Sequence, residues 1–483
     1  MHGMSIFLNF LVIFHFLTTF GASMRKEDSA VEKLCSKIRN GIWAGDTPFT
    51  PRKVPFFYGW VIVFAATVGT LFSIPGQTMG FSVFTDILME ELKLSRVALS
   101  MAYFIGTVGG GFVLPWLGRV LDRIGERKMA VASSLSTGMI LLYLSFVAPI
   151  SRWIGGWVDA SWQTMVSFIV IALGFFMIRT SAQGVLTLTC RNAVGKWFHY
   201  YRGMALAISG VFVSFGFSAA PRFLDALVNR FDYQNAWRIL GFLTIGLMAP
   251  LAWLLFRDSP EESGLKMDGD LSVNNRKEHP DMNIKEDFSL HRALRTHAFW
   301  LFNLSFAFYA LFGTAYTFHI VAIGEEFGFP KERIFKLFVP MAAVSVTTNL
   351  LFGWINPFLR LKYLLIIMNL GAAVGVLGLV GLNQQGGVAA YIIGNGIASG
   401  GFVSLTGIVW PRFYGRTWLG AISGLGMSFM VIGSGTGPLL FGWAGDTFGA
   451  FKPVLTSCLV IPVLLALAAF KADNPQRALM ERT

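Results

Sequence analysis

Charged residues are scarce in this sequence. Asp, Glu, Lys and Arg make up 14% of the 483 residues, whereas apolar residues make up 54%. Soluble domains carry about a quarter charged residues, so these few charges cannot coat the surface of a chain this long. The composition excludes an ordinary soluble protein and predicts one whose surface faces membrane lipid.

Cysteine is also scarce, and several motifs are missing. Cys35, Cys190 and Cys458 are too few and too far apart for a disulfide framework or a cysteine metal site. No glycine-rich phosphate loop of the G-x-x-x-x-G-K-[ST] type is present, and no Ser, His, Asp or Cys cluster suggests catalysis. We therefore expect no enzyme activity, metal, cofactor or ATP drive.

Lys and Arg outnumber Asp and Glu, 39 to 27. In a soluble protein such an excess would point to a nucleic-acid partner. Here the positions of the charges matter more than their sum, because they fall mainly between apolar segments. We expect contact with membrane lipid and no nucleic-acid partner.

Apolar segments long enough to cross a membrane recur along the chain. A helix needs about 20 apolar residues to cross the hydrocarbon core. Twelve segments meet this condition: 57–83, 97–117, 129–150, 164–190, 203–228, 237–256, 298–324, 333–355, 363–383, 387–411, 417–441 and 453–470. The sequence predicts an all-α membrane protein.

The longest polar stretch divides these segments six and six. It covers residues 257–297 and carries several acidic and basic side chains. We therefore predict a bundle of six helices over 57–256, a linker over 257–297, a second bundle over 298–470 and a tail over 471–483.

The basic residues predict the orientation, because loops rich in Lys and Arg stay in the cytoplasm. Most of them fall on one side of the predicted topology, in 24–56, 118–128, 191–202, 257–297, 360–362, 412–416 and the C-terminal tail. Both termini of the twelve-helix body are then cytoplasmic, and the plasma membrane is the expected location.

Residues 5–22 are apolar and precede this body, within an N-terminal segment of 1–56. They fit three alternatives: a cleaved signal peptide, an extra membrane span, or a misassigned start of the protein. No Lys or Arg precedes the apolar run, and cleavage would leave the basic stretch outside. We favour the extra span.

The two halves repeat short patterns. Lys196-Trp-Phe, Arg202 and Ile208-Ser-Gly in the first half correspond to Arg412-Phe, Arg416 and Ile422-Ser-Gly in the second. Transporters are often built from such internal repeats, with the solute site between them near mid-membrane. We expect a central cavity between the two bundles.

One loop carries a glycine, an aspartate and basic residues at fixed spacing. It lies after the second predicted span and comprises Gly118, Asp122, Arg123, Gly125, Arg127 and Lys128. Glycine permits close helix approach, and a carboxylate can cap the positive N-terminus of a neighbouring helix. The plain alternative is a basic loop placed only by the charge rule.

This loop resembles the signature loop of the major facilitator superfamily, and the resemblance extends over nearly the whole chain after residue 55. It implies two six-helix bundles that open alternately to each side, with the loop acting in gating. The later segment 442–449 and the entry 58–63 resemble monocarboxylate and oxalate/formate porters, and we predict that Asp446 in the later segment also acts in gating.

That second resemblance breaks down at the residues that set the substrate. Those porters place charged residues in the first, eighth or eleventh helix. Here the first span, residues 339–352 and residues 419–441 carry none. Their substrates are therefore not carried over, and no membrane carboxylate is present for proton coupling.

Arg179 is the one charge near the middle of a predicted span. Such a charge is costly and is functional by default, and guanidinium pairs well with carboxylates. We predict that Arg179 contacts an anionic solute. The alternative is a structural role, with bonds to Gln77, Gln183 and backbone carbonyls.

Further polar residues within the spans are candidates for the solute site: Gln77, Gln183, His319, Tyr316, Asn349 and Asn395. Gln77 follows Pro75-Gly76, which breaks regular hydrogen bonding and frees backbone groups. His319 could carry a proton. For each of them, packing within the bundle is the alternative.

These observations predict transport of a small organic anion, monocarboxylate-like, by alternating access. A second hypothesis is a neutral or amphipathic solute with Arg179 structural. A third, from another class, is a membrane receptor or scaffold with the same fold; a gating loop would serve no purpose there. The oligomeric state is left open.

Overall fold

We describe the protein from a computed structural model, which covers residues 41–269 and 279–480. The chain divides into two units, Met1–Pro55 and Phe56–Thr483. Of the first unit only 41–55 is described, with one short 3-10 helix at Pro51–Lys53. The apolar segment 5–22 lies outside the described residues.

The described residues of the second unit form helices and contain no β-strand, which confirms the all-α prediction. The helices of the first half are α3 (Gly59–Phe72), α4 (Thr78–Phe81), α5 (Thr85–Leu92), α6 (Arg96–Ile124), α7 (Glu126–Ser145), α8 (Val147–Gly155), α9 (Gln163–Ile178), α10 (Thr187–Trp197), α11 (Arg202–Leu243) and α12 (Ala249–Leu255). Those of the second are α13 (Leu290–Ala293), α14 (His297–Phe318), α15 (Ile320–Glu326), α16 (Lys331–Lys336), α17 (Phe338–Ile355), α18 (Leu361–Val380), α19 (Gly387–Tyr414), α20 (Leu419–Phe448), α21 (Lys452–Ala468) and α22 (Arg477–Met480).

Within the described residues, ten helices are long and apolar enough to cross a membrane. The number of such helices is lower than the twelve predicted spans for two reasons. The run Arg202–Leu255 has 54 residues and turns back at Asp232, whose φ of 64° is left-handed, so it contains two predicted spans. The first predicted span is interrupted after Phe72, so that α3 has only 14 residues.

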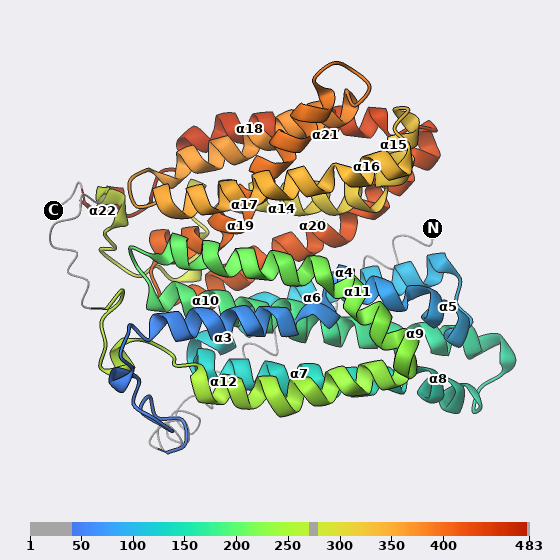
Figure 1. Cartoon of the computed structure of the whole chain (residues 1–483), viewed down its shortest axis with the longest axis horizontal. Helices are drawn as coiled ribbons and strands as arrows, with labels where there is room; N and C mark the ends of the chain where they lie inside the picture. The colour runs from blue at the N-terminus through green and yellow to red at the C-terminus, as the bar shows by residue number, and fades with distance from the viewer. Residues whose placement is uncertain (1–40, 270–278, 481–483) are drawn as a thin grey trace. The chain divides into compact units, whose positions relative to one another are not determined.

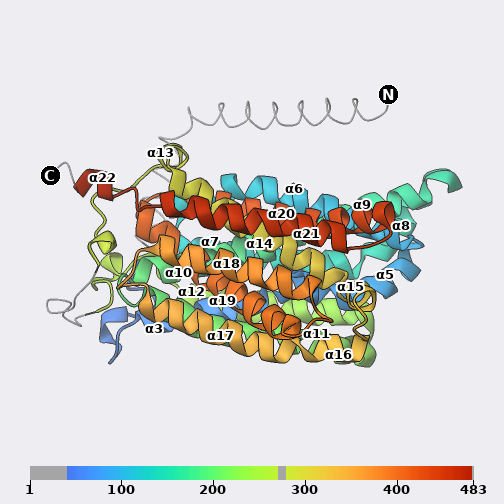
Figure 2. The same cartoon turned by 90° about the horizontal axis from the view of Figure 1, so that it is seen from above.

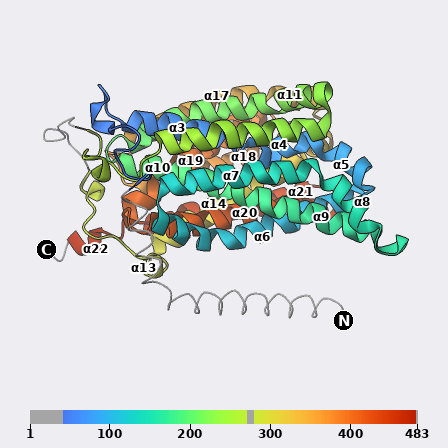
Figure 3. The same cartoon turned by 90° about the horizontal axis from the view of Figure 1, so that it is seen from below.

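The second unit consists of two groups of helices. Figure 1 shows the blue-to-green helices α3 to α12 on one side and the yellow-to-red helices α14 and α17 to α21 on the other. Figure 2 and Figure 3 show that the long helices of both groups run along one common direction. Across the boundary, α6 packs on α20 and α11 packs on α17.

The body has two ends with different loops. One end carries the loop between α6 and α7 and the described parts of the 257–297 segment; we call it the linker end. The other carries α5, α15 and α16, and we call it the far end (Figure 1).

Two interrupted helices pack against each other in the first half. Between α3 and α4, Ile74–Gly76 forms a 3-10 turn around Pro75, which cannot donate a helical hydrogen bond. Between α9 and α10, Arg179–Leu186 is π-helical, a geometry often found at functional sites. A Cβ at Gly76 would collide with Ala182, so the glycine permits this contact.

Candidate functional site

A cavity of about 660 Å³ lies between the two halves. Its first-half wall comes from the broken first helix, the π-helical stretch, α10 and α11, and its second-half wall from α14, α19 and α20. The residues that line it are Thr70, Gln77, Thr78, Met79, Ser82, Gln183, Thr187, Arg191, Val213, Phe217, Tyr309, Ala310, Gly313, Thr314, Tyr316, Thr317, Phe318, Phe402, Met427, Met430, Val431 and Ser434.

Arg191 is the one charged residue among those that line the cavity. Its Nη1 lies 3.5 Å from the hydroxyl of Thr406 in the second half. Among the described residues no carboxylate lies within ion-pair distance of it. A guanidinium without a counter-ion in a cavity is a strong site for an anion.

Arg191 also separates the large cavity from a smaller one. A second cavity of about 20 Å³, lined by Asn192, Trp410 and Ser423 among others, lies against the same guanidinium. Ser423 donates a hydrogen bond to the Asn192 Oδ1 across the halves at 3.1 Å. Arg191 therefore stands at the floor of the large cavity, where the first and second halves meet.

The sequence predicts that Arg191 lies in a cytoplasmic loop, because the fourth predicted span ends at Cys190. The helix instead continues as α10 to Trp197. Gln183, Thr187 and Arg191 follow at intervals of four residues, which places them on one helical face, and all three line the cavity. That polar spacing was the signal for Arg191.

Arg179 lies outside the cavity wall, with 3% of its surface exposed. Its Nη1 donates to the carbonyl oxygen of Gly76 at 3.0 Å, and its guanidinium lies 5.0 Å from the ring centre of Tyr103. It thus joins the π-helical stretch to the break after α3. This geometry favours the structural alternative for Arg179.

Three of the other predicted site residues lie in the cavity wall: Gln77, Gln183 and Tyr316. Gln77 donates a hydrogen bond to the Ser73 hydroxyl at 3.1 Å. The Oε1 of Gln183 is buried and has no hydrogen-bond partner within the described residues. Such an atom is a ready acceptor for a solute donor.

The structure places His319, Asn349 and Asn395 outside the cavity. His319 Nε2 lies 3.0 Å from the carbonyl oxygen of Pro438. Asn349 donates to the Ala207 carbonyl at 3.2 Å, which joins the two halves. Asn395 donates to the Tyr391 carbonyl in its own helix at 3.2 Å. Each of the three contacts a helix backbone.

The Gly118 loop joins the halves at the linker end. The Asp122 carboxylate accepts hydrogen bonds from the backbone N–H groups of Gly420 at 2.5 Å and Ala421 at 2.7 Å, in the first turn of α20. A Cβ at Gly118 would overlap the Gly420 carbonyl. The carboxylate therefore sits at the positive end of the α20 dipole.

Other residues of this loop hold the first half together. The Arg127 backbone N–H donates to Asp258 Oδ1 at 2.8 Å, and its Nε donates to the Trp253 carbonyl at 2.8 Å. Gly125 has a φ of 89° and packs on the Asp258 side chain. Arg123 is exposed and Lys128 partly exposed.

Asp446 lies apart from this loop. It is exposed in the last turns of α20, at the end of that helix opposite to Gly420. The gating role predicted for Asp446 is therefore not supported by any contact with the Gly118 loop.

Buried ionic contacts add to the linker end. Lys196 Nζ lies 2.6 Å from Glu126 Oε1, which is fully buried. Arg416 donates to the Lys196 carbonyl at 2.9 Å and pairs with Glu261 at 2.9 Å. Burial opposes ionisation of Glu261, but hydrogen bonding from Arg416 holds its pKa below the ordinary value.

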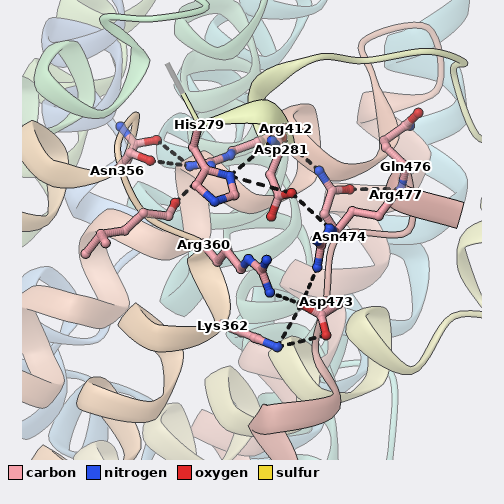
Figure 4. Close-up of polar contacts among 11 residues, drawn as sticks. His279, Asp281, Asn356, Arg360, Lys362, Arg412, Asp473, Asn474, Gln476 and Arg477 are labelled. Atoms are coloured by element: carbon pink, nitrogen blue, oxygen red, sulfur yellow. Dashed lines mark hydrogen bonds and ion pairs between the residues drawn. The ribbon is translucent and has the colours of Figure 1, made fainter. Parts of the chain in front are cut away.

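A polar cluster fastens the C-terminal tail at the same end (Figure 4). Lys362 pairs with Asp473 at 2.8 Å, and Arg477 lies 3.3 Å from Asp281. Asn474 donates to the Asp281 carbonyl at 2.8 Å. Burial lowers the pKa of His279, which lies beside Asp281. These contacts stay within the second half and the linker.

The cavity opens toward the far end. Thr78, Met79 and Phe318 line it and are exposed, Phe318 by 67%. Hydrogen bonds between the halves, by contrast, gather at the linker end, around Asp122, Asn192 and Arg416. The structure is sealed at the linker end and open at the far end.

A sequence profile described as Major Facilitator Superfamily matches residues 66–394. The chain belongs to the major facilitator superfamily. As a member, the protein is a multi-pass membrane transporter that works by alternating access, and its superfamily is generally not one of enzymes.

A curated superfamily relative agrees with this assignment. The MFS-type transporter pytF of Aspergillus terreus is 23% identical over 223 residues, which cover 45% of this chain and 68% of the relative.

Solved structures of superfamily transporters share the fold. A bacterial homologue of the iron transporter ferroportin, in an outward-facing state, matches with a TM-score of 0.60 at 16% identity and covers 85% of this chain and 99% of its own. The human organic anion transporter MFSD10 matches with a TM-score of 0.56 at 13% identity, over 85% and 99%. The proton:xylose symporter XylE matches with 0.56 at 16%, over 86% and 95%.

Superfamily membership explains why the cavity and the linker-end contacts occur together. Alternating access requires a solute cavity between two halves that part at one end while they close at the other. The cavity above Arg191 and the contacts around Asp122 have this arrangement.

Proposed function

We propose that this transporter carries a small organic anion and that Arg191 is the residue that binds its charge. The observation that supports this is a guanidinium at the floor of a cavity whose other lining residues are uncharged, with no carboxylate within ion-pair distance of it in the part of the chain that the structure describes. The proposed anion-binding residue is therefore Arg191 instead of Arg179, which lies twelve residues earlier in the same helical run.

Electrostatics supports an anion over a neutral solute. A cation held partly out of water is unfavourable unless an opposite charge approaches it. An entering carboxylate would supply that charge and accept two parallel N–H bonds from the guanidinium. The neighbouring Thr187 hydroxyl and Gln183 amide lie on the same helical face and add polar contacts.

The position of Arg191 also supports a coupling to gating. Its bond to Thr406 joins the halves at the floor of the cavity. A bound carboxylate would compete with Thr406 for the guanidinium, which weakens one contact that keeps the linker end closed. Separation of Asp122 from the start of α20 would then open the cavity to the linker side.

We further propose that the linker end faces the cytoplasm, because the basic loops gather there. The state described above is then outward-open, and both termini of the helical body are cytoplasmic. The plasma membrane and a monocarboxylate-like solute remain predictions. The human organic anion transporter MFSD10 has a similar structure and is compatible with this proposal, but at 13% identity it shows only a shared fold.

The test is uptake by the purified protein in liposomes, with labelled carboxylates beside the corresponding neutral amides. We expect uptake of carboxylates and about 30-fold or more slower uptake of the amides, because removing one charge of a buried, hydrogen-bonded pair costs about 2–5 kcal/mol. Equal uptake of acid and amide would refute the anion site and favour the neutral-solute hypothesis. Failure of acids, amides, amino acids, sugars and inorganic anions alike would favour the receptor or scaffold hypothesis.

A further inference from the structure

The two walls of the cavity differ in chemistry. The first-half wall carries Arg191 together with the amides and hydroxyls of Gln77, Gln183 and Thr187. The second-half wall carries the large side chains of α14, α19 and α20: Tyr309, Tyr316, Phe318, Phe402, Met427 and Met430. The first-half wall also has the apolar side chains of Met79, Val213 and Phe217, but it alone carries a charge. A solute in this cavity therefore meets a mixed, cationic surface on one side and a mainly aromatic and thioether surface on the other.

The aromatic side chains of the second wall are held in place by one another. The rings of Tyr309 and Phe402 lie 4.6 Å apart between their centres, and those of Tyr316 and Tyr391 lie 6.2 Å apart in an edge-to-face arrangement. Both distances fall in the range of favourable ring pairs. The wall is therefore a prepared surface for another ring rather than a set of loose side chains.

The polar groups of the second wall are already bonded. The hydroxyls of Thr314 and Ser434 bond to each other at 2.8 Å, and Thr314 also donates to the Ala310 carbonyl at 2.8 Å. On the first wall, by contrast, Gln183 Oε1 has no partner within the described residues and Arg191 has no counter-ion there. Free polar recognition is thus confined to the first wall.

The methionines bring the two surfaces together at the cavity floor. Met427 and Met430, 7% and 8% exposed, line both the large cavity and the small cavity beneath Arg191. The thioether side chains of α20 therefore line the same two cavities as the guanidinium. Methionine side chains adapt their shape and make favourable contacts with aromatic rings.

From this division we infer that the transported solute is an amphipathic carboxylate with an aromatic or similarly flat apolar body, rather than a short acid or an inorganic anion. Its carboxylate would bind Arg191, and its ring would pack on Tyr309, Phe402 and the two methionines. The inference rests on the proposed anion site at Arg191 and adds the body of the substrate to it.

The size of the cavity supports this class. Pockets that enclose a drug-sized ligand measure about 300–1,000 Å³, and this cavity measures about 660 Å³. Acetate or oxalate would contact Arg191 but leave the second wall hydrated. A ring that covers this wall gains the burial free energy of its apolar surface.

The test uses four probes with the purified transporter in liposomes: acetate, hexanoate, benzoate and 3-phenylpropanoate, each as an inhibitor of labelled 3-phenylpropanoate uptake. We expect 3-phenylpropanoate to inhibit at a concentration at least about tenfold lower than acetate does. Phe402→Ala should reduce this preference severalfold while acetate inhibition stays unchanged. Phe215→Ala is the matched control, because Phe215 is 69% exposed and lies outside the cavity lining.

The outcomes separate this inference from the proposed function. If acetate and 3-phenylpropanoate inhibit equally and both lose their effect in Arg191→Gln, the anion site stands and the aromatic surface is refuted. If hexanoate matches 3-phenylpropanoate, the second wall selects any apolar body, and the preference for rings is wrong. If 3-phenylpropanoate binds as well to Arg191→Gln as to the wild type, the anion site itself is refuted. Should Phe402→Ala fail to fold, Met430→Leu, which keeps the volume and removes the sulfur, tests the same wall.

Discussion

Arg179 and Arg191 lie on one helical run, yet their surroundings differ in almost every respect. Arg179 is 3% exposed, donates to the Gly76 carbonyl and lies over the Tyr103 ring. Arg191 faces a cavity and has one weak contact, to Thr406, within the described residues. A charged residue in a membrane helix can thus either stabilise helix packing or bind the solute, and the groups it contacts indicate which of the two roles it has.

The comparison also explains how a charge can lie at mid-membrane without an acidic partner. The break after α3 leaves carbonyl groups outside the helical ladder, and Gly76 offers one of them to Arg179. The guanidinium and the helix break therefore satisfy each other. Among the described residues Arg191 has no such carbonyl partner, and its side chain lines the cavity.

The largest expected effect comes from Arg191→Gln. The substitution removes the charge of the cavity floor, and we expect kcat/KM for carboxylate uptake to fall about 30-fold or more, since removing one partner of a buried charge pair costs about 2–5 kcal/mol. Liposome uptake measures this change, and thermal unfolding in detergent should stay near the wild-type value. Arg222→Gln, an exposed arginine on α11, is the control. Unchanged uptake by Arg191→Gln would contradict the proposal that Arg191 binds the solute whereas Arg179 has a structural role.

Arg179→Gln should act on stability instead. It leaves the Gly76 carbonyl without its donor, and an unpaired buried group costs about 1–3 kcal/mol. We expect a lower unfolding temperature, and the preference for a carboxylate over its amide should persist in the protein that remains folded. A lost preference with normal stability would return the anion site to Arg179, as the sequence predicted.

Gln183→Leu should have a smaller effect, because it removes a neutral group from the wall between these two arginines. The Gln183 Oε1 lacks a partner, so its loss costs the protein little. We expect kcat/KM for a solute with a hydrogen-bond donor to fall severalfold, in line with about 0.5–1.5 kcal/mol for one neutral hydrogen bond. Solutes without a donor should be transported as by the wild type. An equal loss for both solutes would mean that Gln183 only shapes the helix.

The last expected effect concerns stability alone and leaves transport unchanged; it arises in a third arginine environment, at the linker end. Burial lowers the pKa of His199 to about 4, and three nearby arginines, Arg202, Arg412 and Arg416, add to the shift. As the pH falls from about 6.5 to 4, the unfolded chain takes up a proton there before the folded protein does, so stability should decrease by about 1–3 kcal/mol. Asp268 accepts the backbone N–H of His199. A His199→Gln variant should show a flatter dependence of unfolding temperature on pH; an unchanged dependence would exclude His199 as its source.

The sequence was sufficient for the fold and for part of the site. Apolar length and charge predicted the all-α membrane body, and polar residues next to Pro75 and within the fourth span predicted Gln77 and Gln183 in the cavity wall. Arg191 was missed because a charge after Cys190 looked like the end of a span. Whether a polar residue faces a cavity or a neighbouring backbone depends on helix rotation, which composition does not contain. His319, Asn349 and Asn395 illustrate this limit.

The pairing of Asp122 with the first turn of α20 has a consequence for the conditions that shift this transporter. The contact joins a charge to a helix end across the two halves, in a partly buried place where salt screens little. Parting the halves instead hydrates the carboxylate and the N–H groups of α20. Solutes excluded from protein surfaces oppose such hydration. The population of the far-end-open state should therefore respond to osmolyte concentration more than to ionic strength.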